Sequence, residues 1–112
     1  MEIMVERYDN DITVLSIQGA IDGSSAPHLR QAIVDACEDN PMLLLDMHQV
    51  HFMSSAGLRV MLLLYRQLQE LDGKVVLVGL REPIYDAMEA TGFLKYFQTA
   101  PNIETGAKLL GV

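Results

Sequence analysis

The sequence predicts a single α/β domain over residues 1–112, with a mixed, mostly parallel sheet of about five strands and about four helices. Half of the residues are hydrophobic, which is enough for a packed core. Short apolar runs typical of buried strands alternate along the chain with longer segments of helical periodicity. The first two strand-like runs are separated only by Asp9-Asn10-Asp11, whose turn chemistry predicts an opening hairpin.

The first segments predict two strands and a loop. Residues 3–8 alternate apolar and polar side chains, which is typical of a strand near the edge of a sheet. Residues 12–18 are rich in β-branched side chains, which favour a second strand. Residues 19–25 are expected to form a loop, at the end of which Ser24 or Ser25 caps the next helix.

The next helix is indicated by apolar residues that recur at helical spacing from Leu29 to Cys37, and it ends at Asn40-Pro41. Pro27 is accommodated in its first turn, where a backbone amide would lack a partner anyway. Cys37 is the only cysteine, so no internal disulfide can form, which is typical of a reducing cytoplasm. We expect its thiol to be a small core group rather than a reactive one.

The stretch from Met42 to Leu71 organises the chain. Residues 42–47 are a nearly unbroken apolar run, which predicts a strand buried on both faces. Residues 59–68 are too long for a typical strand and predict a largely buried helix. Between them a strand must turn into a helix, and this junction holds four small residues: Ser54, Ser55, Ala56 and Gly57. A hydroxyl at such a junction is a helix cap, a nucleophile or a phosphorylation site.

The remaining chain predicts two helices and two strands. Asp72-Gly73 is a helix stop, and residues 74–80 form an apolar, β-branched strand. A helix that begins at Pro83 runs through Ala90. Residues 103–110 predict a last helix. Residues 93–98 are expected to form a short edge strand with three side chains in the core: Phe93, Leu94 and Phe97.

The charge balance argues against nucleic acid and membrane partners. The chain has 15 acidic and 8 basic residues and a formal net charge of −7, whereas nucleic acid and anionic membranes attract clustered Lys and Arg. Residues 1–7 carry acidic charge, unlike a signal peptide. The longest apolar run, residues 60–65, is far shorter than the roughly 20 residues that span a bilayer. We therefore expect a cytoplasmic protein.

Two loops should open at the same edge of the sheet. Strands and helices alternate after the hairpin, which implies parallel strands joined by right-handed crossovers. In such sheets, functional sites gather at the carboxyl ends of the strands. The loop with Asp22 and the loop with Ser55 both follow a strand and precede a helix, so we expect them to lie side by side.

Catalytic and metal sites are disfavoured by the residues around these loops. A Gly-x-Ser-x-Gly nucleophile elbow at Ser55 would need glycine where the sequence has Met53. The sequence shows no histidine base with an orienting acid for that serine. His48 and His51 lack a cluster of Cys, Asp or Glu in register, so we expect no metal and no cofactor. No Gly-rich loop ending in Lys-Ser/Thr is present, so any nucleotide affinity should be weak.

Several motifs occur along the chain in one order: Gly19-Ala20-Ile21-Asp22, Leu44-Leu45-Asp46-Met47, Phe52-Met53-Ser54-Ser55-Ala56-Gly57-Leu58-Arg59-Val60, Gly79-Leu80 and Thr91-Gly92-Phe93-Leu94-Lys95-Tyr96-Phe97. In this order, and over essentially the whole chain, they resemble a STAS domain, the fold of bacterial anti-sigma factor antagonists. The resemblance implies one STAS-type domain over residues 1–112, with a mixed sheet that opens on a hairpin.

The resemblance also implies a phosphorylation site. The family's loop usually reads Asp-Ser-Ser/Thr-Gly-Leu, and a partner kinase phosphorylates its first serine. Aligned on Gly57-Leu58, the acceptor falls on Ser55, with Ser54 as the second choice. Ser54 then replaces the aspartate, which removes charge from the docking surface. Ala56 replaces the second hydroxyl residue.

The partner-binding surface expected from both arguments comprises nine residues: Asp22, Gly23, Ser24, Ser54, Ser55, Ala56, Gly57, Leu58 and Met61. Leu58 and Met61 are expected to reach the rim of the core and to provide an apolar anchor beside the polar serines.

The mechanism implied by the resemblance is a switch without catalysis of its own. The unphosphorylated protein would bind an anti-sigma factor that is itself a serine kinase of the histidine-kinase-like ATPase type, and would thereby free the sigma factor. Phosphorylation of Ser55 would release the kinase, and a PP2C-like phosphatase would restore the hydroxyl. Two alternatives stay open: a non-phosphorylated STAS adaptor or subunit of another complex, such as a transport ATPase, and a weak nucleotide-sensing module.

Overall fold

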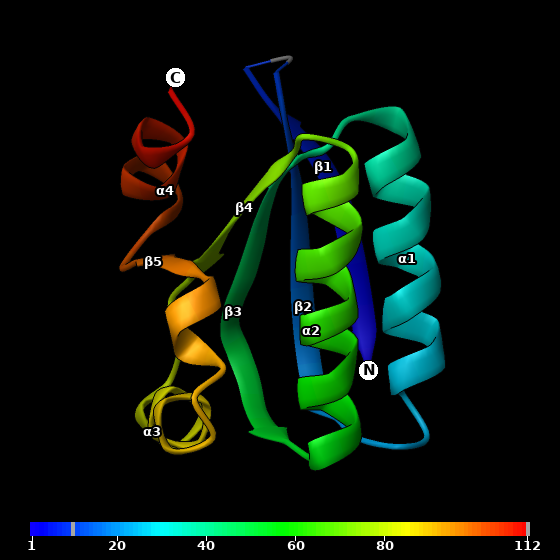
Figure 1. Ribbon diagram of the computed structural model, residues 1–112, viewed down its shortest axis with the longest axis vertical. Helices are drawn as coiled ribbons and strands as arrows, with labels where there is room; N and C mark the ends of the chain where they lie inside the picture. Colours follow the sequence, from blue (N-terminus) through cyan, green and yellow to red (C-terminus); the bar gives the residue numbers. More distant parts are fainter. Residues whose placement is uncertain (10, 112) are drawn as a thin grey trace.

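The computed structural model describes residues 1–9 and 11–111, which form a five-stranded sheet covered by helices (Figure 1). The strands are β1 (Glu2–Tyr8), β2 (Ile12–Ile21), β3 (Met42–Met53), β4 (Lys74–Val78) and β5 (Gln98–Ala100). The helices are α1 (Ala26–Asp39), α2 (Ser55–Glu70), α3 (Glu82–Ala90) and α4 (Ile103–Leu109), with a short 3₁₀ turn at Leu94–Tyr96. The predicted α/β class and the opening hairpin are confirmed.

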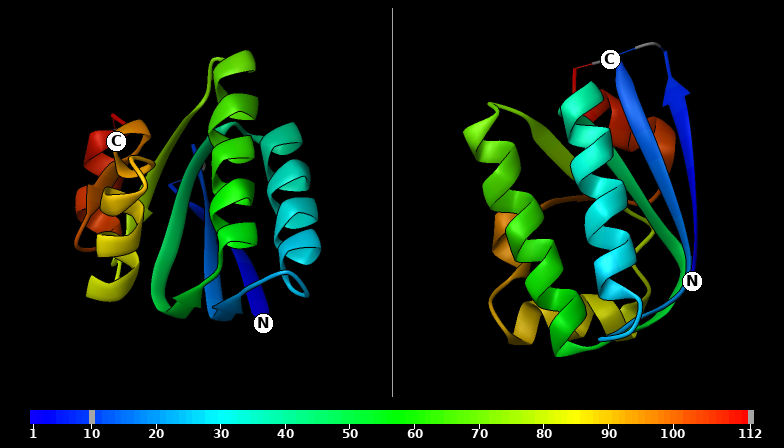
Figure 2. Two further views of the ribbon diagram at one scale, coloured as in Figure 1. Left: turned by 60° about the horizontal axis from the view of Figure 1, so that its bottom comes forward. Right: turned by 90° about the vertical axis from the view of Figure 1, so that its right-hand side faces the viewer.

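The strands lie in the sheet in the order of the chain, β1-β2-β3-β4-β5. β1 runs antiparallel to β2, and every later pair of neighbours is parallel, which is the mixed, mostly parallel sheet that the sequence predicts. The helices α1 and α2 lie side by side on one face, and α4 lies on the other (Figure 2). No helix in the described part of the chain is long and apolar enough to cross a membrane.

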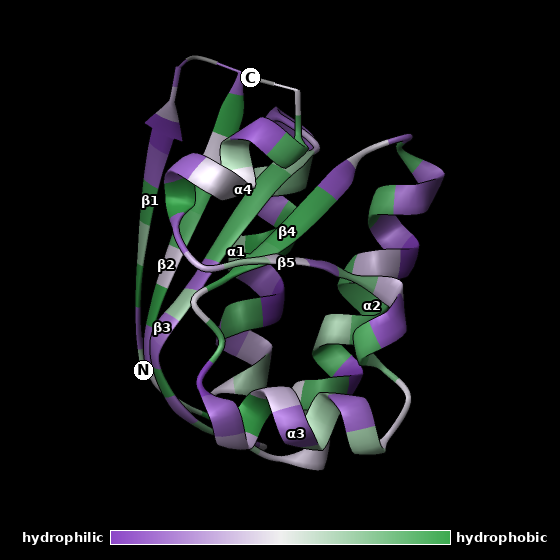
Figure 3. Cartoon of the chain, turned by 90° about the vertical axis from the view of Figure 1, so that its left-hand side faces the viewer, coloured by the Kyte–Doolittle hydropathy of each residue, from purple (hydrophilic) through white to green (hydrophobic). Residues whose placement is uncertain are grey.

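The first half of β3 is buried on both faces, which explains its unbroken apolar sequence. Leu43 and Leu45 belong to the large core beneath α1 and α2, whereas Leu44 belongs to the smaller core beneath α4. Successive side chains of a strand point to opposite faces, so a strand between two helical layers needs apolar residues at every position. Figure 3 shows this hydrophobic centre in β4 and in the first half of β3.

The strand β3 is longer than predicted, and it is bent. The sequence predicts its end at Met47, but it continues through polar residues to Met53. The register between β2 and β3 shifts twice, once after Ser16 and once after Gly19, and each shift places one extra residue on β3. Such bulges bend a strand, and Figure 1 shows the resulting curve of β3. The curved half leads directly into α2.

The predicted edge strand over residues 93–98 is wrong. Leu94–Tyr96 form the 3₁₀ turn, and the edge strand β5 follows it and pairs with β4. Phe97 is buried as predicted, and its ring packs edge-on against Tyr65 of α2 with centroids 5.9 Å apart. Tyr96, within the turn, also packs against Tyr65, with ring centroids 5.1 Å apart. These ring contacts favour a turn here over an extended chain, because packed rings contribute large apolar areas.

Cys37 lies in the core beneath α1, as the sequence predicts. Only 2% of its surface is exposed. Burial disfavours the charged thiolate and raises the pKa of the thiol to about 11. The residue is therefore a small core group.

Candidate functional site

The two loops that the sequence brings together do meet at one edge of the sheet. β2 ends at Ile21 and β3 ends at Met53, and these two residues are paired in register. The backbone N–H of Ser54 donates to the carbonyl oxygen of Ile21 at 2.8 Å. This bond ties the start of α2 to the loop that leads from Asp22 into α1. The predicted convergence of the two loops is confirmed.

Ser54 and Ser55 have different environments at the start of α2. Ser54 is the N-cap residue, and its Oγ accepts a hydrogen bond from the N–H of Gly57 at 3.4 Å. Ser55 is the first helical residue, and its side chain is exposed. Within the described residues, neither the Ser55 hydroxyl nor the backbone N–H groups of Ser55 and Ala56 make a hydrogen bond. The capping role belongs to Ser54, which leaves the Ser55 hydroxyl accessible.

Gly57 allows the first turn of α2 to approach both strand ends. A Cβ atom at this position would lie 2.8 Å from Cγ2 of Ile21, 2.8 Å from Cγ of Met53 and 3.0 Å from the carbonyl oxygen of Ile21. Carbon atoms of different side chains prefer separations of about 3.5–4.0 Å. A residue larger than glycine would therefore push α2, and with it Ser55, away from the end of β2.

Asp22 organises the neighbouring loop through one carboxylate oxygen. Its Oδ1 accepts from the hydroxyl of Ser24 at 2.7 Å, from the N–H of Ser24 at 2.9 Å and from the N–H of Ser25 at 3.1 Å. These bonds, that from the Ser24 hydroxyl first, lower the pKa of Asp22 below its ordinary value of 3.8. Asp22 therefore carries a negative charge at neutral pH.

The expected side-chain cap of α1 is absent from Ser25, and this prediction is wrong. Ser25 is the N-cap residue by position, but its hydroxyl caps no helical amide. The hydroxyl instead donates to the carbonyl oxygen of Ala20 at 2.8 Å and accepts from the N–H of Asp22 at 2.9 Å. Serine side chains bond readily to nearby backbone groups, and here the end of β2 offers both a donor and an acceptor. The Ser24 hydroxyl is likewise used by Asp22.

The nine residues expected to bind a partner differ in exposure. The six residues of the two loops are exposed or half-buried: Asp22, Gly23, Ser24, Ser54, Ser55 and Ala56. The other three, Gly57, Leu58 and Met61, are buried. The expectation that Leu58 and Met61 reach the rim is wrong, since Leu58 is 8% exposed and Met61 is 0% exposed. Leu58 and Met61 pack onto the sheet, so neither provides an apolar anchor for a partner.

Phe52 is the large apolar side chain exposed beside the serine loop, and sequence reasoning missed it. It is 51% exposed, whereas Val50 is buried. Strict alternation predicts the same face for both residues. In the structure, however, Val50 pairs with Gly19 and Phe52 pairs with Ala20, so one extra residue, His51, lies between them. The bulge reverses the alternation and turns Phe52 away from the face of Val50.

The described residues contain no group of three or more His, Cys, Asp or Glu side chains arranged to hold a metal ion. His48 lies on the curved half of β3, where its Nδ1 is 2.5 Å from Oδ1 of Asp46. Ser55 makes no hydrogen bond to a histidine in the same part of the chain. The geometry at this edge is that of an exposed hydroxyl beside an acidic loop.

The sequence model of the STAS domain family matches residues 2–106 of this chain. The chain belongs to the STAS domain family. The anti-sigma-B factor antagonist of Bacillus subtilis is 29% identical to it over 108 residues, which are 96% of this chain and 98% of that protein. The anti-sigma-B factor antagonist of Listeria monocytogenes is 28% identical over 93 residues, which are 82% of each chain.

Solved structures show the same STAS fold. The crystal structure of an anti-sigma factor antagonist from Mycobacterium paratuberculosis is 31% identical, with a TM-score of 0.85, and the match covers 96% of this chain and 92% of that one. The anti-sigma factor antagonist SpoIIAA in its unphosphorylated form has a TM-score of 0.76 at 16% identity, with 99% of this chain and all 100% of that chain covered. At this lower identity the likeness concerns the fold alone.

Proposed function

We propose that this STAS domain protein is an anti-sigma factor antagonist that is switched by phosphorylation of Ser55. The observation that carries the proposal is the exposed hydroxyl of Ser55 at the start of α2, beside the loop of Asp22. Relatives named as anti-sigma factor antagonists match nearly the whole chain, which supports the same role. The protein is then a kinase substrate and a competitor of the sigma factor, and it supplies no catalysis.

The surroundings of the two serines support Ser55 rather than Ser54 as the acceptor. A kinase must bring ATP to the hydroxyl oxygen, and the side chain of Ser55 is exposed whereas that of Ser54 is half-buried. Ser54 is also held at two atoms, since its N–H donates to Ile21 and its Oγ accepts from Gly57. Modification of Ser54 would disrupt the cap of α2, and modification of Ser55 would not.

A phosphate on Ser55 should leave the fold intact. It adds about −1.5 to −2 charges and three acceptor oxygens. The unpaired N–H groups of Ser55 and Ala56 and the dipole of α2 favour such a charge by about 0.3–1 kcal/mol. Arg59 follows one helical turn later and is exposed, so its guanidinium neighbours the phosphate on the helix surface.

The same phosphate should weaken docking of a partner. The surface already carries the charge of Asp22, and the phosphate would more than double the negative charge there. In an interface, both groups lose water, and like charges that are brought together without partners cost several kcal/mol. A small effect on folding and a large effect on binding are the two properties that a reversible switch requires.

The proposed partners follow from this cycle, which we place in the cytoplasm. The unphosphorylated protein binds an anti-sigma factor that is a serine kinase with a histidine-kinase-like ATPase fold, and the sigma factor is displaced. The kinase then phosphorylates Ser55 and releases the protein. A PP2C-like phosphatase restores the hydroxyl. Phe52 and the loop from Asp22 to Ser24 provide the apolar and polar parts of the docking surface.

The test is phosphate transfer from ATP by the cognate anti-sigma kinase, followed by the intact mass of the protein. The wild-type protein should gain one phosphate. Ser55→Ala should gain none and should bind the kinase constitutively, and Ser55→Asp should stay folded but bind weakly. Ser54→Ala is the matched control, because it removes the neighbouring hydroxyl and should still gain one phosphate. Equal phosphorylation of Ser55→Ala and the wild-type protein would overturn the assignment.

A second candidate is a STAS adaptor that is never phosphorylated, and one observation favours it. Ser54 stands where the family's loop carries an aspartate, and it caps α2 with a neutral oxygen. The docking surface therefore lacks one carboxylate that a kinase of this class can recognise. If this candidate is correct, the mass of the protein should stay unchanged after incubation with the kinase and ATP. Ser54→Asp, which restores the carboxylate, should then enable the transfer.

A further inference from the structure

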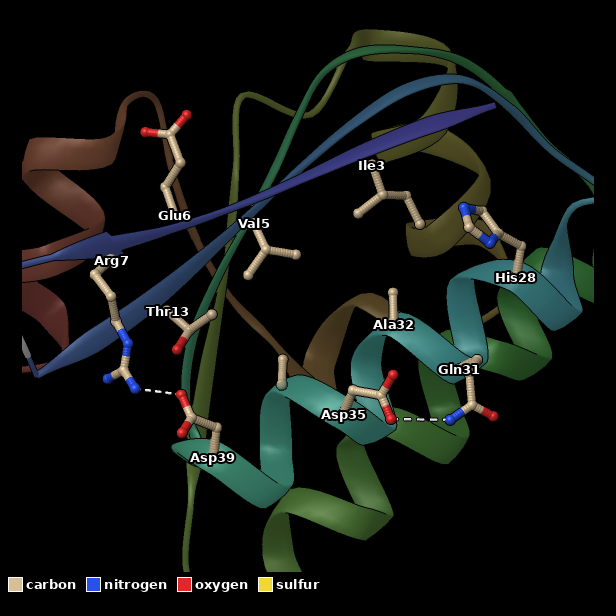
Figure 4. A pocket seen from close by; sticks show the side chains of 11 residues that line it. Ile3, Val5, Glu6, Arg7, Thr13, His28, Gln31, Ala32, Asp35 and Asp39 are labelled. Atoms are coloured by element: carbon tan, nitrogen blue, oxygen red, sulfur yellow. Dashed lines mark hydrogen bonds and ion pairs between the residues drawn. The ribbon is translucent and has the colours of Figure 1, made fainter.

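A groove lies between the edge strand β1 and the helix α1 (Figure 4). Its volume is about 460 Å³, which is within the usual range of about 300–1,000 Å³ for ligand sites. Ile3 and Val5 of β1 line it from one side, and Ala32 and Ala36 of α1 line it from the other. On the face of α1 that looks toward β1, these two alanines lie among polar side chains and are too small to fill the space.

Two side chains in the groove lack the contacts that their positions call for. Val5 pairs with the fully buried Leu15 on the helical face of the sheet, yet Val5 is 57% exposed. Thr13 is only 2% exposed and points into the groove, and its hydroxyl has no hydrogen-bond partner among the described residues (Figure 4). Buried hydroxyl groups almost always have a partner. An occupant with apolar groups would cover Val5, whereas the Thr13 oxygen is enclosed by protein atoms and is not reached from the groove.

The outer edge of β1 adds a backbone component to this site. Within residues 1–9 and 11–111, β1 is the first strand of the sheet and pairs with β2 alone, so its other edge carries N–H and C=O groups without a neighbouring strand. An open strand edge above a groove that is closed by a helix is the arrangement in which sheets accept an extended peptide as an additional strand.

Charges on β1 specify which peptide fits. Side chains alternate along the strand, so Glu2, Met4 and Glu6 point to the opposite face from Ile3 and Val5. Figure 4 shows the side chain of Glu6, which borders the groove, pointing away from α1. A strand added to β1 presents its own side chains alternately to the same two faces. Apolar side chains would fill the groove, and Lys or Arg side chains would lie beside the two glutamates.

One antiparallel register of β1 with a second copy of itself is unfavourable. Antiparallel pairing of β1 with itself about Met4 would set Glu2 of each strand directly opposite Glu6 of the other. Like charges directly opposite each other destabilise a strand pair. The two glutamates of β1 therefore disfavour this register, and they favour a partner strand with basic side chains.

We propose that β1 and α1 bind an extended segment of a partner protein in which apolar residues alternate with Lys or Arg, and that this segment adds a sixth strand to the sheet. The groove is closed at one end by the ion pair of Arg7 with Asp39. At the other end it reaches His28, in the first turn of α1, close to the loop of Asp22. The proposal does not depend on phosphorylation of Ser55.

The test is fluorescence anisotropy with a labelled peptide, acetyl-Lys-Val-Lys-Val-Lys-Val-Lys-amide, and the full chain. The peptide should bind with a dissociation constant below about 1 mM at physiological salt. The double variant Glu2→Lys/Glu6→Lys should weaken binding of this peptide about tenfold or more. The same variant should bind a second peptide in which every Lys is replaced by Glu. Glu70→Lys/Glu89→Lys is the matched control, because it makes the same charge change at exposed helix positions and should leave binding unchanged.

A second pair of variants tests the groove itself. Ala32→Leu should narrow the groove and weaken binding, whereas Ala90→Leu, an equal change at an exposed position of α3, should leave binding unchanged. A block peptide of identical composition, Lys-Lys-Val-Val-Val-Lys-Lys, should bind more weakly than the alternating one. The proposal is overturned if the block peptide binds equally well, which would mean charge attraction alone, or if the alternating peptide does not bind.

Discussion

Replacement of Gly57 by alanine should destabilise the protein, because the first turn of α2 has no room for a methyl group. The added Cβ atom would lie 2.8 Å from side-chain carbons of Ile21 and Met53, and 3.0 Å from the carbonyl oxygen of Ile21. The Met53 side chain is flexible and can move. The carbonyl group of Ile21 is held by the N–H of Ser54 at 2.8 Å, so that contact is relieved only if α2 moves.

Two effects of opposite sign determine the magnitude. Overpacking of this kind costs about 1–3 kcal/mol. Alanine is more favourable than glycine by about 1 kcal/mol inside a helix, and the gain is smaller in the first turn, where the amides have no intrahelical partners. The net loss should be about 1–2 kcal/mol, which corresponds to a decrease in Tm of roughly 4–8 °C for a domain of this size.

Urea unfolding followed by circular dichroism measures this loss, and Gly23→Ala provides the matched control. Gly23 belongs to the neighbouring loop of the same site, and a Cβ atom there would meet no atom within 4 Å. The control should change the free energy of unfolding by less than about 0.5 kcal/mol. If Gly57→Ala is as stable as the wild-type protein while the control is neutral, then α2 does not need glycine to approach the strand ends, and the reasoning is refuted.

Three further predictions concern single side chains. Ser54→Ala should lower the free energy of unfolding by about 0.5–1 kcal/mol, which is the low end for a helix cap because the hydrogen bond to Gly57 is long. An unchanged denaturation midpoint would show that the cap contributes nothing. In an NMR titration the pKa of Asp22 should lie below 3.8, and Ser24→Ala should raise it; identical midpoints would contradict the role of the Ser24 hydroxyl. Because the pKa is lowered in the folded state, this loop stabilises the protein above pH 3.8, and the stabilisation is lost as the pH falls through the folded-state pKa. The pKa of Cys37 is about 11 instead of 9.0, so near pH 8 its thiolate fraction should be about a hundredfold smaller than that of an exposed cysteine. Cys37 should therefore react with a thiol reagent only after the protein is unfolded in urea, and rapid labelling of the native protein would contradict its burial.

Local patterns were sufficient to predict most of the elements, although not the strand at residues 93–98, and to predict the meeting of the two loops. The apolar run at residues 42–47 indicates a strand between two layers, and the small residues after it indicate a helix start. The rule that parallel strands carry their sites at their carboxyl ends then places Asp22 near Ser55. The hydrogen bond from Ser54 to Ile21 confirms this placement.

Three features of the site could not be predicted, because each depends on contacts that one element makes with another. The exposure of Phe52 depends on a bulge in the pairing of β2 with β3, which alternation within β3 alone does not reveal. The burial of Met61 depends on how deeply α2 settles on the sheet, and Gly57 determines that depth. The hydroxyl of Ser25 bonds to Ala20 instead of capping α1, because the end of β2 comes within reach.

The amino-acid sequence by itself determined the fold class, the order of the elements and the two serines at the start of the central helix, since these depend on the spacing of apolar and small residues within one segment. Only the tertiary structure decided that Ser54 is the cap while Ser55 is exposed, and that β1 borders an unfilled groove. The physical reason is that spacing tells which face of an element is apolar, whereas exposure and hydrogen bonding depend on what packs against that face.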